Sequence, residues 1–412
     1  MRAADNRLST PAIPRAGIAV AAFFMQLALG AVYAWSVFLN PLREHFAASK
    51  VEVNLTFTIT LAVLGVTAGF GGSLQRRIGP RATASLAGLF FGAGVLLSGI
   101  APNLGALYLA HGILGGIGLG LGYIVPLAVL IGWFPDRRGF ITGLAVTGFG
   151  LGALVTGPMA TELIRAYGVQ TTLIMLGGAY LVVVVIAAQF MRSAPDNYRP
   201  AGWQSPTQHA VSSGAEATLA EALRSPGWCL LWLMLALNVT AGAALISVAA
   251  PLTQDLLHVG SGLAVLTVCL ISLFNGIGRL FWGALSDRIG RPSTFLALFL
   301  LQAGAFILLP ASGHFAVFLV LVAVIALCYG GGFGTMPAFA TDVFGAKNAG
   351  AVYGAMLTAW SAGAIAGPLL IASIPYRTAL VVIASMLVQA ASLPLLFQAL
   401  AHRGRAKVLS FN

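Results

Sequence analysis

The chain has 412 residues, of which 58% are hydrophobic and only 8% are charged. A soluble domain has about 25% charged residues, so this chain cannot cover a water-exposed surface, and disordered chains are poor in apolar residues. Together with a mean hydropathy of +0.92, this composition indicates an integral membrane protein. The three cysteines all lie in apolar runs, which excludes a disulfide framework and a zinc site.

Apolar runs of about 20 residues, the length of a membrane-spanning helix, occur twelve times. They lie at 17–39, 53–73, 82–100, 104–133, 140–163, 170–191, 227–250, 260–285, 293–311, 315–340, 348–373 and 377–401. The runs lack the alternation over roughly ten residues that is typical of barrel strands. Residues 1–16 are polar without a cleavage-site pattern, so we expect no secretory signal. The sequence predicts an all-α membrane protein with twelve transmembrane helices.

The positive charges predict the orientation of these helices. Of the 22 Lys and Arg residues, 17 fall on the side of the N-terminus, four on the opposite side, and Arg279 lies inside a span. Because cytoplasmic loops are enriched in Lys and Arg, we expect both termini in the cytoplasm and the protein in a cell membrane. The net charge of +11 therefore reflects the cationic loops on the cytoplasmic side. We expect the lipid bilayer as a partner and no nucleic acid.

The two halves of the chain form an internal repeat. A polar linker, 192–226, separates the predicted six-helix bundles 1–191 and 227–412. Residues at an offset of 211 match, mostly as Gly or Pro: Gly72/Gly283, Arg77/Arg288, Ile78/Ile289, Gly79/Gly290, Gly120/Gly331, Pro126/Pro337, Gly139/Gly350, Gly143/Gly354 and Gly152/Gly363. Two related six-helix halves are typical of secondary transporters, whose site lies near the midplane between the halves and which work by alternating access.

The loop 283–291, GALSDRIGR, resembles the major facilitator signature between helices 8 and 9. Asp287, followed by Arg288, could lie beneath the N-terminus of helix 11 and latch the cytoplasmic side, since an anion there is favoured by about 0.3–1 kcal/mol. The alternative is that both residues only mark a charged loop. The first-half counterpart, GSLQRRIGPR at 72–81, has Arg76 where the acid is usual, so the two latches should differ.

Three further stretches narrow the resemblance. They are GAVYAWSVF at 30–38, WFPDRRG at 133–139 and NGIGR at 275–279. Together they resemble the oxalate/formate antiporter family, whose relatives include the bacterial monocarboxylate (lactate) transporters, over essentially all twelve spans. The resemblance implies the major facilitator fold and a carrier of small carboxylates.

Arg279 is the one cation well inside a span, and no Asp or Glu accompanies it there. A guanidinium at a helix centre costs roughly 2.5–3.5 kcal/mol on insertion scales, and it cannot lose its proton. We therefore expect its partner to be a carboxylate substrate, which its planar fork fits. Asn275, one turn earlier, could orient Arg279 or the substrate. The alternatives are that Arg279 snorkels to the cytoplasm or binds backbone carbonyls.

Aromatic residues at matching depths are candidates to line the substrate site. The substrate-binding candidates are Tyr33, Tyr123, Phe149, Tyr329, Phe333 and Trp360. Each alone could equally be a packing residue or part of the interfacial aromatic belt. Members of the resembled family that carry a dicarboxylate have a second cation three residues after the tryptophan. This chain has Gly363 at that position. One cation balances one carboxylate, so we favour lactate, pyruvate or formate over oxalate.

Coupling stays open between proton symport and exchange. His111, His258 and His314 fall near predicted outer ends, where we expect interface residues rather than proton carriers. The glycine run 115–122 imitates a dinucleotide motif but lies inside a span, so it predicts helix packing. No catalytic triad or ATP motif is present, so we expect neither an enzyme nor a cofactor, and gradients would drive a carrier that acts as a monomer.

Other hypotheses remain at this stage. The carrier could move a dicarboxylate in the manner of an oxalate/formate antiporter, or another organic anion. It could instead be a drug or sugar carrier that uses Arg279 structurally. From a different class, the chain could be a membrane receptor of the same fold.

Overall fold

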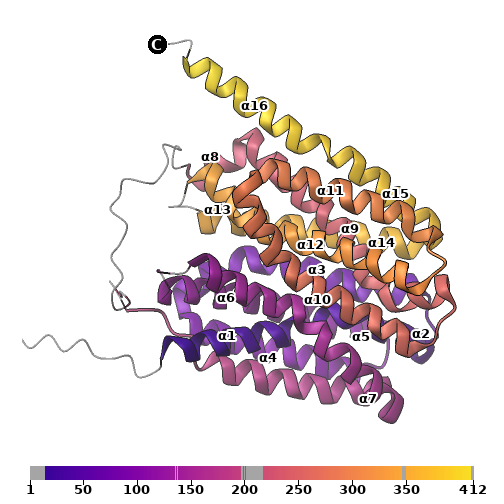
Figure 1. The fold of residues 1–412 in the computed structure, drawn as a ribbon. Coiled ribbons are helices and arrows are strands. Elements are labelled where there is room, and N and C mark those ends of the chain that lie inside the picture. Colours follow the sequence, from indigo (N-terminus) through magenta and orange to yellow (C-terminus); the bar gives the residue numbers. More distant parts are fainter. Residues whose placement is uncertain are drawn as a thin grey trace, which may run out of the picture.

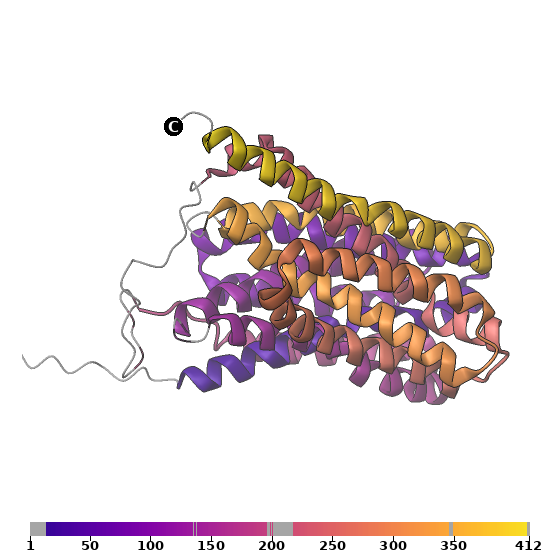
Figure 2. The same ribbon diagram turned by 45° about the horizontal axis from the view of Figure 1, so that its top comes forward.

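The computed structural model describes residues 14–134, 136, 138–195, 198, 200, 217–345 and 349–409. Throughout that part of the chain the regular structure is helical. The N-terminal half, indigo to magenta in Figure 1, forms one bundle, and the C-terminal half, salmon to yellow, forms the other. The turned view in Figure 2 shows the long helices of both bundles running in roughly the same direction, as membrane-spanning helices do.

The N-terminal bundle is built from long apolar helices. It comprises α1 (Arg15–Leu29), a 3₁₀ segment (Gly30–Ala34), α2 (Trp35–Phe46), α3 (Lys50–Ile78), α4 (Pro80–Ser98), α5 (Leu104–Leu107), a π-helical segment (Tyr108–Gly115), α6 (Gly116–Trp133) and α7 (Arg138–Ala188). The 51-residue α7 covers two predicted spans. Gly168, with φ 79° and ψ 166°, divides it at a conformation that only glycine adopts readily.

The C-terminal bundle repeats this plan. It comprises α8 (Leu219–Arg224), α9 (Pro226–Leu257), α10 (Ser261–Ile289), α11 (Arg291–Leu308), a 3₁₀ turn (Leu309–Ala311), α12 (Phe315–Phe344), α13 (Ala349–Met356), α14 (Thr358–Ser373), α15 (Tyr376–Ala390) and α16 (Ser392–Leu409). Eleven helical runs in the described chain are long and apolar enough to cross a membrane. Because α7 holds two spans, the prediction of twelve is confirmed.

The internal repeat is visible in the helix ends. α10 begins and ends 211 residues after α3, α9 does so after the run α1–α2, and α12 does so after the run α5–α6. The turns match as well, since Gly79 and Gly290 have φ of 84° and 85°, while Ala47 and His258 have φ of 49° and 53°. Equal helix lengths and equal turn conformations confirm the pseudo-symmetry of the two bundles.

Two irregular segments of the N-terminal bundle have no counterpart in the C-terminal bundle. The 3₁₀ segment and the π-helical segment correspond to regular stretches of α9 and α12. The first span also runs to Phe46 rather than to 39, so it is two turns longer than predicted. Segments of this kind often occur at functional sites, and the 3₁₀ segment contains Tyr33.

The predicted linker, 192–226, contains the short helix α8, while 201–216 lie outside the described residues. Thr218 caps α8 and shares a capping box with Glu221. The backbone and hydroxyl hydrogen bonds from Thr218 lower the pKa of the Glu221 carboxyl, because they stabilise its ionised form. The domain boundaries at 191 and 227 stay a prediction.

The two bundles meet along a seam formed mainly by α3 against α14 and by α7 against α10. The Ser272 hydroxyl donates to the Gly150 carbonyl at 2.7 Å, and the Ser361 hydroxyl donates to the Ala62 carbonyl at 2.7 Å. A Cβ on Gly150 would lie 2.8 Å from the Gly276 Cα, so α7 and α10 pack with their backbones in contact, as small residues permit.

Candidate functional site

Arg279 lies on α10 beside the seam and is only 2% exposed. Its guanidinium carbon lies 5.0 Å from the centre of the Phe333 ring and 5.9 Å from that of Phe149. Phe333 belongs to the C-terminal bundle and Phe149 to the N-terminal bundle. The guanidinium therefore faces the seam, not lipid or the cytoplasmic surface, which excludes snorkelling.

Most hydrogen-bonding groups of this cation are free in the structure. Its Nε donates to Asn275 Oδ1 at 3.4 Å, a long contact. Both terminal guanidinium nitrogens are buried without a hydrogen bond of normal geometry, although the Tyr33 and Tyr123 hydroxyls interact with the guanidinium. The amide nitrogen of Asn275 and the indole nitrogen of Trp360 are also buried and unpaired. All four groups are donors, and buried donors normally have partners. The site is therefore arranged for a ligand that accepts hydrogen bonds.

Six aromatic side chains form a closed ring at this position, three from each bundle. In order they are Tyr33, Phe149, Tyr123, Trp360, Phe333 and Tyr329, with centroids of successive rings 4.7–6.1 Å apart. All but one of the successive pairs join residues that are distant in the sequence. Each ring member is at most 2% exposed. The structure thus brings all six predicted lining residues together and holds the site closed.

One hydrogen bond within this aromatic ring joins the two bundles. The hydroxyls of Tyr33 and Tyr329 lie 2.9 Å apart. Tyr33 also interacts electrostatically with Arg279. Separation of the bundles at this level must break the hydroxyl contact, so it connects the state of the site to the arrangement of the bundles.

Tyr353 on α13 is a site residue that the sequence analysis did not identify. Its hydroxyl interacts with that of Tyr123, and Tyr123 also interacts with Arg279. Tyr353 lies seven residues, or two helical turns, before Trp360. That spacing on one predicted span could have identified it, although a turn at Leu357 separates α13 from α14 and makes the helical register less regular.

Close packing of α10 on α12 fixes the position of Arg279. A Cβ on Gly334 would lie 2.1 Å from the Arg279 carbonyl oxygen, and one on Gly330 would lie 2.1 Å from the Asn275 carbonyl oxygen. Only glycine leaves room for this approach. Close packing of the 3₁₀ segment on α7 fixes the position of Tyr33 in the same way, because a Cβ on Gly30 would lie 2.0 Å from the Phe149 carbonyl oxygen.

Gly363 explains why no second cation is present at its position. A Cβ there would lie 2.6 Å from the Ala236 carbonyl oxygen and 2.7 Å from the Val239 Cβ, so α14 packs directly on α9. Among the described residues whose exposure is known, no Asp, Glu or Lys side chain is buried. Within that part of the protein, Arg279 has no buried acid to neutralise it.

The residues of the predicted cytoplasmic latch have ion-pair partners that the sequence analysis did not identify. Asp287 pairs with Arg291 at 2.6 Å, and Arg291 also pairs with Asp342 at the end of α12, at 3.0 Å. Residues 346–348, just before α13, lie outside the described residues, so the contact with the N-terminus of helix 11 stays a prediction. Arg288 is exposed. In the first half, Arg76 instead donates to Ser73.

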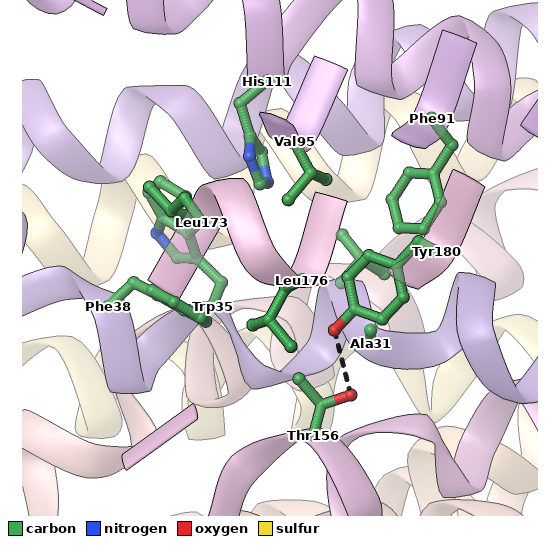
Figure 3. A pocket seen from close by; sticks show the side chains of 11 residues that line it. Ala31, Trp35, Phe38, Phe91, Val95, His111, Thr156, Leu173, Leu176 and Tyr180 are labelled. Atoms are coloured by element: carbon green, nitrogen blue, oxygen red, sulfur yellow. Dashed lines mark hydrogen bonds between the residues drawn. The ribbon is translucent and has the colours of Figure 1, made fainter. Parts of the chain in front are cut away.

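His111 is not the interface residue that we expected. It is 8% exposed, lies in the π-helical segment, and points into a cavity of about 20 Å³ inside the N-terminal bundle (Figure 3), enough for about one water molecule. Its Nδ1 lies 3.4 Å from Ser98 Oγ, and a Thr156–Tyr180 hydroxyl pair borders the same cavity. No member of the aromatic ring around Arg279 lines it, so it is separate from that site.

Comparisons with known proteins agree with this architecture. The model of the Major Facilitator Superfamily matches residues 18–368 and 237–410. The uncharacterized MFS-type transporter YhjX of Escherichia coli (strain K12) is 30% identical over 341 residues, covering 82% of this chain and 83% of that protein. The oxalate:formate antiporter of Oxalobacter formigenes is 28% identical, covering 89% and 87%. Monocarboxylate transporter 13 of Rattus norvegicus is 29% identical over 42% of this chain and 40% of its own.

A solved structure shows the same fold. It is a bacterial homolog of the human lysosomal transporter Spinster, in an inward-facing and unoccupied conformation. Its TM-score is 0.73, with 93% of this chain and 96% of that chain covered at 15% sequence identity. At this identity the similarity concerns the fold alone.

Proposed function

The chain belongs to the Major Facilitator Superfamily, and we propose that it carries small monocarboxylates of the lactate, pyruvate or formate type by alternating access. It is a multi-pass membrane protein whose fold and relatives are those of transporters, not of enzymes. The predicted resemblance to oxalate/formate antiporters and monocarboxylate transporters is confirmed. The substrate and the roles of the site residues are our proposal.

The unpaired guanidinium of Arg279 carries the proposal. Its two terminal nitrogens, with those of Asn275 and Trp360, form a set of buried donors without a resident acceptor. A buried charge with unmade hydrogen bonds is costly. A carboxylate can accept two parallel hydrogen bonds from a guanidinium, and the aromatic ring supplies apolar contact for a short carbon chain.

Charge balance favours one carboxylate over two. A monocarboxylate would neutralise Arg279, whereas the second charge of oxalate would stay uncompensated in a low-dielectric site. The packing of Gly363 against α9 leaves no room there for a second cation. The name of one relative, an oxalate:formate antiporter, makes a dicarboxylate the main competing substrate.

Exchange of one carboxylate for another is the coupling that we propose. The unladen protein must return with a charged, unpaired Arg279 across the closed state, and that charge cannot be removed by deprotonation. The laden protein passes through the same state with a neutral ion pair. Return with cargo should therefore be faster than return without it.

Orientation and domain division follow the sequence predictions. We propose that both termini lie in the cytoplasm of a cell-bounding membrane, that the bundles divide at 192–226, and that Asp287 and Arg288 act in a cytoplasmic latch. The distribution of 17 and four cations between the two sides supports the orientation. A monomer with twelve spans is sufficient for this mechanism.

The test compares Arg279→Ala and Arg279→Lys with wild type in reconstituted liposomes, using exchange of labelled lactate. We expect the Ala variant to lose exchange and the Lys variant to be strongly impaired, because an ammonium cannot form the bidentate pair. Arg165→Ala is the matched control, since Arg165 is exposed and pairs with the exposed Glu162. Full activity in Arg279→Ala would refute the anion site.

A binding panel separates the remaining hypotheses. Thermal shifts of the purified protein with lactate, pyruvate, formate, oxalate, a sugar and a cationic drug should show stabilisation by the monocarboxylates. Stabilisation by oxalate above lactate would favour the dicarboxylate alternative. Binding of lactate without any flux in liposomes would favour a receptor of this fold.

A further inference from the structure

A second group of polar residues lies at one end of the seam, at the helix ends that Figure 1 shows far from the end of α16. There α2 ends and α3 begins in the N-terminal bundle, while α9 ends and α15 begins in the C-terminal bundle. The residues that meet are Asn40, Arg43, Lys50, Gln254, Asp255 and Tyr376. We call this group the seam-end cluster.

Two contacts of the seam-end cluster cross between the bundles, and a third lies within α2. The Asn40 amide nitrogen donates to Gln254 Oε1 at 3.3 Å, and an Arg43 terminal nitrogen donates to Asn40 Oδ1 at 3.2 Å. The Lys50 ammonium lies 4.0 Å from the centre of the Tyr376 ring. These contacts hold the seam closed at this end.

The charges of the cluster do not balance. Lys50 interacts with both Arg43 and Asp255, and Tyr376 interacts with the same two residues. Among the described residues, neither cation comes within 4.0 Å of a carboxylate. The three nearby acids, Glu44, Glu52 and Asp255, are all exposed, and Glu52 accepts the Ser49 N–H at the start of α3. The cluster thus holds two half-buried cations that no carboxylate of the described residues contacts closely.

Two donors of the cluster are buried and unpaired. They are Arg43 Nε and the Tyr376 hydroxyl, and Tyr376 is only 9% exposed. Both point to a missing acceptor, since buried polar groups normally have partners. With the Lys50 ammonium beside them, the acceptor that satisfies the chemistry is an anion with more than one oxygen.

We propose that the seam-end cluster is a second carboxylate site, at which the transported acid binds on its way to or from Arg279. This inference rests on the proposed function. Tyr33 and Arg43 belong to the same helical run, ten residues or about 15 Å apart, so the cluster lies along the seam at one mouth of the pathway. A carboxylate there replaces the contacts that close the seam and so favours its opening.

The experiment measures lactate transport from each side of the membrane, in cells and in inside-out vesicles, for Lys50→Gln, Lys50→Arg and Tyr376→Phe. For Lys50→Gln we expect KM to rise about tenfold on the side of the cluster only, the effect of losing one charge-assisted hydrogen bond, with kcat unchanged. Lys50→Arg should restore KM. Arg377→Gln, an exposed cation at the same end, is the matched control.

Equilibrium binding distinguishes this inference from the proposed function. Lactate-induced thermal stabilisation should persist in Lys50→Gln, because Arg279 still binds, and should disappear in Arg279→Ala. An unchanged KM, an equal change on both sides, or a loss confined to kcat would overturn the second site. Absence of lactate binding in wild type would instead overturn the proposed function.

Discussion

At the scale of single residues, Arg279 is the residue on which the proposed function rests. It is a permanent charge, only 2% exposed, which donates one long hydrogen bond to Asn275 and is surrounded by aromatic rings. Its remaining donors have no resident acceptor. A residue that supplied such an acceptor would compete directly with the substrate.

Asn275→Asp tests this competition. The new carboxylate would lie where Asn275 Oδ1 now meets Arg279 and would supply the counter-ion that the site lacks. Because this carboxylate would form an ion pair with the guanidinium, we expect lactate affinity to fall more than about tenfold. Isothermal calorimetry measures this affinity. Asn275→Leu is the control, and an equal loss in Leu and Asp would contradict a competing charge.

The hydroxyl pair Tyr33–Tyr329 is the second residue-level contact, since it bonds the bundles at the level of the site. In a double-mutant cycle of Tyr33→Phe and Tyr329→Phe, we expect a coupling of about 0.5–1.5 kcal/mol in lactate-bound thermal stability. Tyr180→Phe, whose hydroxyl bonds Thr156 within one bundle, is the control for loss of a phenol. Additive single effects would show that the contact does not couple the bundles.

At the scale of helices, irregularity and glycine position the site. The 3₁₀ segment that contains Tyr33 has no counterpart in α9, although the surrounding helices repeat at an offset of 211. On the opposite side, α10 and α12 approach so closely that Gly330 and Gly334 contact the Asn275 and Arg279 carbonyls. The positions of Arg279 and of its ring partner Phe333 therefore depend on backbone contact.

Gly334→Ala tests this dependence. The added Cβ would lie 2.1 Å from the Arg279 carbonyl oxygen, so α10 and α12 must separate, and overpacking costs about 1–3 kcal/mol. We expect a lower melting temperature and reduced lactate exchange. Gly304→Ala on α11, where a Cβ meets nothing within 4 Å, is the matched control. Unchanged activity in Gly334→Ala would mean that Arg279 does not require this close approach.

At the scale of the whole molecule, two related bundles enclose one cation between them. The ring around Arg279 takes three aromatic residues from each bundle, so access to it requires the bundles to move relative to one another. Among the described residues, the contacts that close the seam include neutral hydrogen bonds, such as the one that the Asn54 amide donates to the Pro368 carbonyl. Such contacts can break and re-form as the bundles move, whereas the unpaired charge of Arg279 opposes that movement when no substrate is bound.

Exchange should therefore exceed net flux. In liposomes preloaded with labelled lactate, we expect external lactate to accelerate efflux at least about tenfold, which corresponds to about 1.4 kcal/mol between laden and unladen return. An imposed pH gradient without external lactate should have a much smaller effect. His111→Gln should leave exchange unchanged, because His111 lies outside the Arg279 site. Efflux driven equally well by the pH gradient alone would favour proton symport.

The sequence by itself determined the class, the twelve spans, the repeat and the position of Arg279 as a cation inside a span. Hydrophobic length sets a membrane helix, the Gly and Pro repeats record turns that only certain residues can adopt, and a lone intramembrane cation stands out against an apolar background. These are local properties of the chain. Matching depth along the spans then selected the six aromatic residues.

Tertiary structure alone decided how those residues meet. That Tyr33 bonds Tyr329, that six aromatic side chains close into one ring, and that Gly363 abuts α9 are contacts between helices distant in the sequence. Tyr353 and the burial of His111 escaped prediction because helical rotation and irregular turns decide which face a residue presents. Hydropathy reports how deep a residue lies along a span, but only packing between bundles fixes its direction.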